Sequence, residues 1–369
     1  MNRLHVATRK GLFTLDRSHG IWEISKLDFL AIPVTQVLQD TRDDTLYAAV
    51  KHEHFGSKMH RSDDHGQTWQ EIATPEYPPK PEGYVEKRPM EGEPYEWKLK
   101  LLWSLETGGP SEPGLIWCGT LPGGLFVSRN RGDSWELVRS LWDMPERGEW
   151  FGGGADYPGI HSICIDPRDS RHVTVGVSCG GAWATYNGGD TWVCRGQGMR
   201  ADFMPPDMAY YPNVQDPHRM AQCESAPDTM YIQHHNGIFK TTNAGEKWEE
   251  ITDVSPSVFG FPVVVHPGDP DTAWFVPAQK DEYRIPVDGK VVVTRTRDGG
   301  RSFQTLTNGL PQNHAYDLVF RHAMDITPDG NTLAFGSTTG SLWVSEDQGD
   351  SWTTISSNLP PVYQVRFAH

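Results

Sequence analysis

One eight-residue pattern recurs six times along the chain, and it restricts the fold more than any other feature. It reads Ser/Thr-x-Asp/Asn-x-Gly-x-Ser/Thr followed by an aromatic residue, with one copy that has lost its second hydroxyl residue. The copies follow one another at intervals of roughly 50–65 residues, which is typical of repeat folds. Their closing aromatic residues are Trp69, Trp135, Trp192, Trp248, Phe303 and Trp352.

The chemistry of the pattern is that of a tight hairpin turn. Asp or Asn hydrogen-bonds to nearby backbone, Gly supplies a positive φ, and the hydroxyl residues close the loop. Apolar alternation precedes each copy, as in Gly124–Ser128, and a short strand follows it. Each unit is then a small antiparallel sheet that cannot bury both faces alone. Radial stacking of such sheets solves this problem, so we predict an all-β propeller.

These residues resemble the bacterial neuraminidase (BNR) or Asp-box repeat, shared by sialidases, sortilin-type receptors, some glucanases and photosystem II assembly factors. More narrowly, the phrases Arg9–Phe13 and Thr296–Gly300 are similar to bacterial proteins labelled as BNR-repeat glycosyl hydrolases. The resemblance implies the β-propeller fold over nearly the whole chain. It implies little about function, because one fold carries many functions.

The chain ends decide the number of blades. Residues 1–25 contain three strand-like stretches and a degenerate box but have no innermost strand. Residues 361–369 resemble the innermost strand of the next unit, Pro33–Leu38. We therefore predict one domain over residues 1–369, a seven-bladed propeller of four-stranded antiparallel blades. Its N-terminal and C-terminal strands pair to complete one blade.

Composition limits the partners. The formal charge of −15 shows no basic face for a polyphosphate, so nucleic acid is excluded as the expected partner. No apolar run reaches membrane-spanning length, and the N-terminus has no basic-then-apolar leader. The five cysteines are an odd number without CxxC spacing. We expect reduced thiols and a cytoplasmic protein with no membrane contact.

Long insertions indicate where function lies. In a four-stranded blade the Asp boxes and the first turn share one side, whereas the links between blades and the middle loops share the other. The box side is accounted for by turn chemistry. The long insertions fall on the other side of the blades, at residues 73–97, 139–159, 196–217 and 278–290. Long loops on a rigid scaffold carry binding and catalysis, so we predict the site in this loop-rich mouth.

Histidines are frequent in these loops. His52, His54, His161, His234 and His235 offer general acid/base groups or hydrogen-bond donors for a sugar or an organic acid. A divalent metal is an alternative, but no fixed zinc-type spacing links the group. We therefore expect no resident cofactor, and assign catalytic roles to His161 and His235.

A second group of candidates lies in insertion 139–159. Glu149 offers a carboxylate for acid/base work, Trp150 an aromatic platform and Arg147 a cation for an anionic group. The alternative is a lid that packs its aromatic rings over the channel. Tyr316 and Arg9 join His52, His54, Arg147 and Trp150 as expected substrate contacts. Glycosidases need a second carboxylate, and the candidates are Glu53, Asp156, Asp281, Glu282 and Asp317.

The sequence Tyr283–Pro286 resembles the Arg-Ile-Pro motif of sialidases, whose arginine binds the substrate carboxylate. In sialidases that motif precedes the first box, whereas here it precedes the fifth. We interpret Arg284 as a loop arginine and do not expect true sialidase activity.

Two functions remain open at this point. The first is a hydrolase or lyase that acts on a glycan or a small polar metabolite at the loop-rich mouth. The second is a non-catalytic propeller that binds or assembles a protein partner. The clustering of His, Glu, Arg and Trp favours the enzyme.

Overall fold

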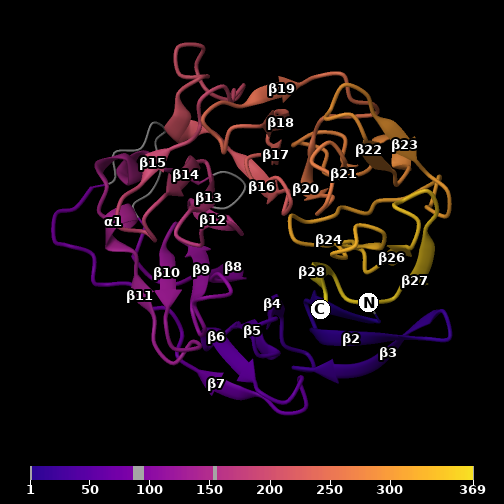
Figure 1. Ribbon diagram of the computed structural model, residues 1–369, viewed down its shortest axis with the longest axis horizontal. Helices are drawn as coiled ribbons and strands as arrows, with labels where there is room; N and C mark the ends of the chain where they lie inside the picture. Colours follow the sequence, from indigo (N-terminus) through magenta and orange to yellow (C-terminus); the bar gives the residue numbers. More distant parts are fainter. Residues whose placement is uncertain (1, 86–94, 153–155, 369) are drawn as a thin grey trace. The chain divides into compact units, whose positions relative to one another are not determined.

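The computed structural model describes residues 2–85, 95–152 and 156–368, and so leaves out parts of the predicted insertions 73–97 and 139–159 and both terminal residues. In these residues 28 strands form seven four-stranded antiparallel sheets (Figure 1). This is the make-up of a seven-bladed β-propeller, as the repeats predict. The chain divides into two compact units, which are described separately.

The first unit comprises Met1–Val37, His218–Ala244 and Glu249–His369 and holds four sheets. Three of them follow the chain from the inner to the outer strand. They consist of β16 (Pro217–Gln222), β17 (Met230–His234), β18 (Gly237–Thr241) and β19 (Glu249–Ile251); β20 (Gly260–Val265), β21 (Ala273–Pro277), β22 (Val293–Thr296) and β23 (Gln304–Leu306); and β24 (Met324–Ile326), β25 (Leu333–Gly336), β26 (Leu342–Ser345) and β27 (Thr353–Ser356). A 3₁₀ turn, η3 (Val287–Gly289), lies between β21 and β22.

The fourth sheet of this unit joins the two ends of the chain. Its strands pair in the order β28 (Val362–Phe367), β1 (Arg3–Thr8), β2 (Gly11–Ser18) and β3 (Ile21–Asp28) (Figure 1). Strands β1 and β28 are antiparallel, with Leu4 opposite Phe367. The predicted completion of the first blade by the C-terminal strand is therefore confirmed.

The second unit comprises Leu38–Pro217 and Gly245–Trp248. Its sheets consist of β4 (Val34–Asp40, which begins at the boundary), β5 (Thr45–His52), β6 (Gly56–Ser62) and β7 (Gln70–Ile72); β8 (Leu101–Thr107), β9 (Ile116–Leu121), β10 (Leu125–Ser128) and β11 (Glu136–Leu137); and β12 (Gly159–Ile165), β13 (Val173–Ser178), β14 (Gly181–Thr185) and β15 (Val193–Cys194). The helical turns α1 (Arg139–Trp142), η1 (Pro145–Glu149) and η2 (Pro212–Val214) lie in its insertions.

The second strands of the blades are buried on both faces. In β13 and β9 all six residues are buried. Such strands need continuous apolar sequence rather than strict alternation. Tryptophans pack against the sheets; in the first unit, for example, the rings of Trp343 and Trp352 each lie 4.8 Å from the ring of Phe335 in the β24–β27 sheet.

The Asp boxes form the predicted outer turns. In the fifth intact box, Asp298 Oδ1 accepts hydrogen bonds from Thr296 Oγ1 (3.0 Å) and from the backbone N–H of Ser302 (2.9 Å), and Gly300 has a φ of +93°. Hydrogen bonds from the Ser302 side chain and backbone lower the pKa of Asp298 to about 2. The carboxylate is therefore committed to closing the turn.

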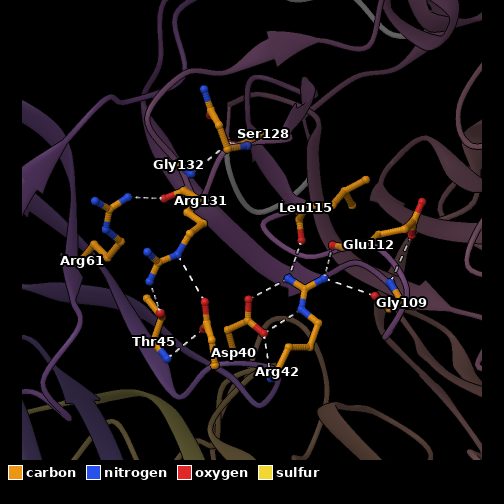
Figure 2. Close-up of polar contacts among 12 residues, drawn as sticks. Asp40, Arg42, Thr45, Arg61, Gly109, Glu112, Leu115, Ser128, Arg131 and Gly132 are labelled. Carbon is orange, nitrogen blue, oxygen red and sulfur yellow. Dashed lines mark hydrogen bonds and ion pairs between the residues drawn. The ribbon is translucent and has the colours of Figure 1, made fainter.

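On the same side as the boxes, arginines connect neighbouring sheets of the second unit (Figure 2). Arg42 lies in the β4–β5 turn and forms a two-pronged ion pair with Asp40, at 2.7 and 2.6 Å. Its guanidinium also donates to the carbonyl oxygens of Gly109, Glu112 and Leu115 in the β8–β9 turn, at 2.6 to 3.2 Å. These contacts give the box side a structural role.

None of the helices that the structure describes has the length and hydropathy required to cross a bilayer. All five cysteines are free thiols, as their spacing predicts. Four of the five are buried.

Candidate functional site

A cavity of about 550 Å³ opens in the insertion between β7 and β8 of the second unit. Its lining residues are Lys80, Tyr95, Glu96, Trp97 and Lys98. The cavity is wide open to solvent, and its lining comprises two aromatic residues, two lysines and one glutamate. The volume is in the range of small-molecule sites, which combine aromatic walls with a few polar groups.

Arg147 supports the aromatic wall of this cavity from behind. Its guanidinium carbon lies 4.0 Å from the centre of the Trp142 ring, 5.3 Å from Trp97 and 5.6 Å from Tyr84. The guanidinium donates to the Trp142 carbonyl at 2.6 Å and to the Tyr84 hydroxyl at 2.5 Å. Such stacking and hydrogen bonding suit a planar, permanently charged group.

This arrangement corrects the role predicted for Arg147. The side chain is buried and already bound on its faces and edges, so it positions Trp97 and Tyr84 rather than offering its charge to a ligand. The aromatic rings continue the support, since Trp97 packs edge to face on Trp142 at 4.9 Å and on Tyr84 at 5.1 Å.

The cations of the cavity come from lysines that sequence reasoning did not single out. Lys80 donates from Nζ to the Tyr95 carbonyl at 3.1 Å, and its ammonium lies 5.7 Å from the ring centres of both Tyr84 and Tyr95. Lys98 is exposed at the rim. Aromatic faces bind the C–H face of a sugar, and ammonium groups bind carboxylate or phosphate as point charges.

Glu149 ends η1, two residues after Arg147, and is partly exposed. Its Oε2 accepts hydrogen bonds from the Tyr211 hydroxyl at 2.8 Å and from Asn213 Nδ2 at 2.7 Å. The pKa of Tyr211 is raised because its hydroxyl donates to this carboxylate. Two donors hold the carboxylate in one orientation, which is what a reacting group requires.

Two further predicted site residues are buried. Trp150 is 1% exposed and packs 5.8 Å from Trp183 in the core, so it offers no platform for a sugar. His161 lies on the inner strand β12 with no exposed surface, its Nδ1 2.9 Å from Ser162 Oγ and its ring 5.4 Å from Trp103. Their apolar surroundings correct the predicted roles in stacking and proton transfer.

The remaining predicted residues lie in turns and coil. His52 ends β5, and His54 lies in the turn that follows. His52 packs edge to face on the exposed Phe55 at 6.2 Å. Arg9 is exposed in the β1–β2 turn, and Tyr316 is exposed in the coil before β24.

The first unit holds a separate histidine cluster. His218, on the inner strand β16, lies parallel to the Phe261 ring at 4.4 Å, and His235 approaches it edge to face at 5.4 Å. Nδ1 of His218 donates to the Gly260 carbonyl at 2.7 Å, so Nε2 is the ring nitrogen with acceptor character.

His218 and His235 are residues of the type that binds a divalent cation. A hydrogen bond from the second ring nitrogen to a carbonyl is the usual support of a metal-binding imidazole. The predicted alternative of a metal named His52, His54, His161, His234 and His235, and of these five His235 packs against His218.

Arg284 behaves as the loop-arginine interpretation expects. Its Nε donates to Asp281 Oδ1 at 3.0 Å within the same loop, and its guanidinium lies 5.5 Å from the Phe261 ring centre. Its carboxylate partner is thus supplied by the chain itself.

Three groups escaped the sequence reading. Lys80 and Lys98 belong to a Pro-rich and Glu-rich stretch whose composition is typical of a solvent-exposed loop. Tyr211 lies in a loop whose sequence contains no motif. His218 had a usable signal, since it begins an inner strand just after a long insertion, as His161 does.

The model of the BNR/Asp-box repeat matches residues 60–71, which span one box. A probable oligoxyloglucan-reducing end-specific xyloglucanase of Neosartorya fischeri is 25% identical over 228 residues, 54% of this chain and 26% of the relative. Sortilin of Rattus norvegicus is 25% identical over 205 residues, 56% of this chain and 22% of the relative. The chain thus matches about a quarter of each relative's length.

Among solved structures, the GH74 xyloglucanase of Xanthomonas campestris superposes with a TM-score of 0.62 at 18% identity. The alignment covers 96% of this chain and 52% of that enzyme. At this identity the similarity establishes the β-propeller fold alone.

Proposed function

We propose that this chain, a β-propeller with BNR/Asp-box repeats, is a hydrolase that binds a negatively charged carbohydrate or a small acidic metabolite. The observation that carries the proposal is the cavity of about 550 Å³ lined by Lys80, Tyr95, Glu96, Trp97 and Lys98, in which two cationic side chains accompany one carboxylate. The similarity to xyloglucanases is consistent with a carbohydrate ligand.

The charge of the cavity argues for the acidic character of the ligand. The whole chain carries −15, and an acidic ligand would be repelled from most of its surface. The two lysines at the cavity supply a local attraction, and the Lys80 ammonium lies 5.7 Å from the ring centres of both Tyr84 and Tyr95. The aromatic rings contribute stacking to either anomer of a sugar ring.

In this proposal Glu149 is the reacting carboxylate. Its orientation is held by Tyr211 and Asn213, and η1 links it to Arg147 behind the cavity wall. Hydrolysis by a carboxylate of this kind proceeds by general acid/base catalysis or by nucleophilic attack.

Calorimetric titration with matched neutral and uronate-containing oligosaccharides tests the binding step. We expect tighter binding of the uronate forms, and a loss of about tenfold or more in affinity for Trp97→Ala, since a stacking ring is worth roughly 1–3 kcal/mol. Lys98→Ala should remove the preference for the charged form. Tyr186→Ala, an exposed aromatic change elsewhere in this unit, and Arg139→Ala are the matched controls. Equal affinity of Trp97→Ala and the parent protein contradicts the assignment.

Product release, followed by mass spectrometry, tests the hydrolytic step. Glu149→Gln should abolish turnover and keep binding, whereas Asp143→Asn, an exposed carboxylate just before η1, should leave turnover unchanged. Full activity of Glu149→Gln would remove Glu149 from the proposal without affecting the binding site.

A second candidate function is recognition of a peptide or protein partner without catalysis. The observation that favours it is a group of exposed aromatic residues in insertion 196–217, namely Phe203, Tyr210 and Tyr211. Sortilin is among the relatives. In this case Tyr210→Ala abolishes partner binding, and Glu149→Gln and Trp97→Ala have no effect on it.

A further inference from the structure

Strand β3 differs from the outer strands of the other six sheets that the structure describes. It has eight residues, whereas those six strands have two to four. It is also the last strand of its sheet, so one of its edges faces away from β2. A long edge can pair with a strand of another molecule, and proteins usually keep such edges short.

Several large apolar side chains on and just after β3 are exposed to solvent. The exposed fractions are 61% for Ile21, 50% for Ile24, 38% for Leu27 and 72% for Leu30, which follows the strand. Ile24 and Leu27 share one face of β3 and Ile21 lies on the other, so both faces of the strand carry exposed apolar side chains.

A β-bulge interrupts the strand at the pair Ile24–Ser25. Glu23 lies opposite Asp16, and Lys26 lies opposite Thr14. Glu23 and Lys26 are three positions apart in β3, whereas Asp16 and Thr14 are only two positions apart in β2. Because Asp16 and Thr14 point to the same face of β2, Glu23 and Lys26 also share a face. An unbulged strand would place them on opposite faces.

The bulge makes the edge complementary to itself. Three residues precede the pair Ile24–Ser25 in the strand and three follow it. If two such strands pair antiparallel about a two-fold axis through the bulge, Glu23 of each copy faces Lys26 of the other. On the opposite face, Trp22 faces Leu27 of the second copy. Opposite charges and apolar pairs at directly opposed positions stabilise a sheet.

We propose that β3 pairs with β3 of a second copy of this chain, so that two four-stranded sheets become one eight-stranded sheet. The second copy is the partner because the charges on the edge complement themselves: Glu23 directly precedes the pair Ile24–Ser25, and Lys26 directly follows it. The interface is isologous, as expected for a two-fold dimer. It involves β3 of the first unit and is independent of the proposed hydrolysis.

Sedimentation equilibrium over a range of concentrations, with single charge reversals, tests the proposal. The parent chain should dimerise. Glu23→Lys and Lys26→Glu alone should each weaken the dimer by about tenfold or more, because each homodimer then opposes two pairs of like charges. An equimolar mixture of the two variants should dimerise again, since every opposed pair then has opposite charges. Glu249→Lys on β19 makes the same change of charge on a short outer strand and should have no effect.

A disulfide test locates the axis and does not depend on the affinity. Ser25→Cys places a thiol beside its counterpart, and oxidised glutathione should convert this variant to a covalent dimer that reducing agent splits. The native cysteines, four of them buried, serve as the background in the parent chain. A parent chain that stays monomeric at all concentrations overturns the proposal. So does a dimer that neither single reversal weakens, or a mixture of variants that does not recover.

Discussion

Arg42 connects the β4–β5 turn to the β8–β9 turn on the box side of the second unit, and replacing it by alanine removes this connection (Figure 2). The side chains of Arg42 and Asp40 are 12% and 1% exposed, so the variant leaves Asp40 as a buried carboxylate without its partner. Breaking a buried ion pair from one side costs about 3–5 kcal/mol. Three carbonyl oxygens in the β8–β9 turn also lose their donor.

The expected change in melting temperature follows from the size of the chain. Unfolding entropy of about 2.1 cal/mol/K per residue converts 1 kcal/mol to roughly 1.3 °C, so Arg42→Ala should melt about 4–6 °C lower. Urea unfolding should give the same loss of free energy. Arg42→Lys keeps the charge but not the planar fork, and we expect an intermediate loss of about 1–3 kcal/mol.

A double-mutant cycle and one control complete this test. Asp40→Asn combined with Arg42→Ala should cost less than the two single changes added together, because each single change leaves an uncompensated buried charge. Arg139→Ala breaks an exposed ion pair with Asp143 and should change stability by less than about 0.5 kcal/mol. The reasoning is refuted if Arg42→Ala is as stable as the control.

Three more outcomes are expected from the same structure. Deleting residues 361–369 should prevent cooperative folding of the parent type, seen as a lost or strongly lowered melting transition, while Phe367→Ala alone should cost about 3–5 kcal/mol because its ring is fully buried. Burial lowers the pKa of His5 to about 4. As the pH falls, His5 is therefore protonated in the unfolded chain before it is protonated in the folded chain, and urea unfolding should show about 2 kcal/mol of stability lost between pH 7 and pH 5. The His5→Leu variant should not show this loss. Burial raises the pKa of the Cys118 thiol strongly and that of Cys194 to about 11, so a thiol reagent should label neither at pH 7 until the protein unfolds, and rapid labelling of Cys118 would contradict its burial.

Much of the fold was predictable because its information is local. Each Asp box contains its own donors, acceptors and positive-φ glycine, so eight residues suffice to identify an outer turn. The pairing of β28 with β1 is not local, yet it too was predictable, because the first blade has no inner strand and the end of the chain supplies the missing sequence. Repetition makes such an absence visible.

The candidate site was predicted only in part. The insertions were identified by their length, and Glu149 is held as an ordered, partly exposed carboxylate. Its neighbours in sequence behave differently, since the Arg147 side chain packs in an aromatic cluster and the Trp150 side chain packs in the core. Three residues of similar promise within four positions have three different surroundings, and residue type cannot distinguish them.

What the sequence determined by itself is therefore the repeat: six boxes, a degenerate seventh unit and two ends that complete one blade. Only the tertiary structure decided which insertion residues meet at a cavity, because Lys80, Trp97 and Arg147 come together through packing between segments far apart in the chain. It also showed the bulge that brings Glu23 and Lys26 to one face of β3. Turn chemistry acts over a few bonds, whereas a site depends on which side chains burial leaves at the surface.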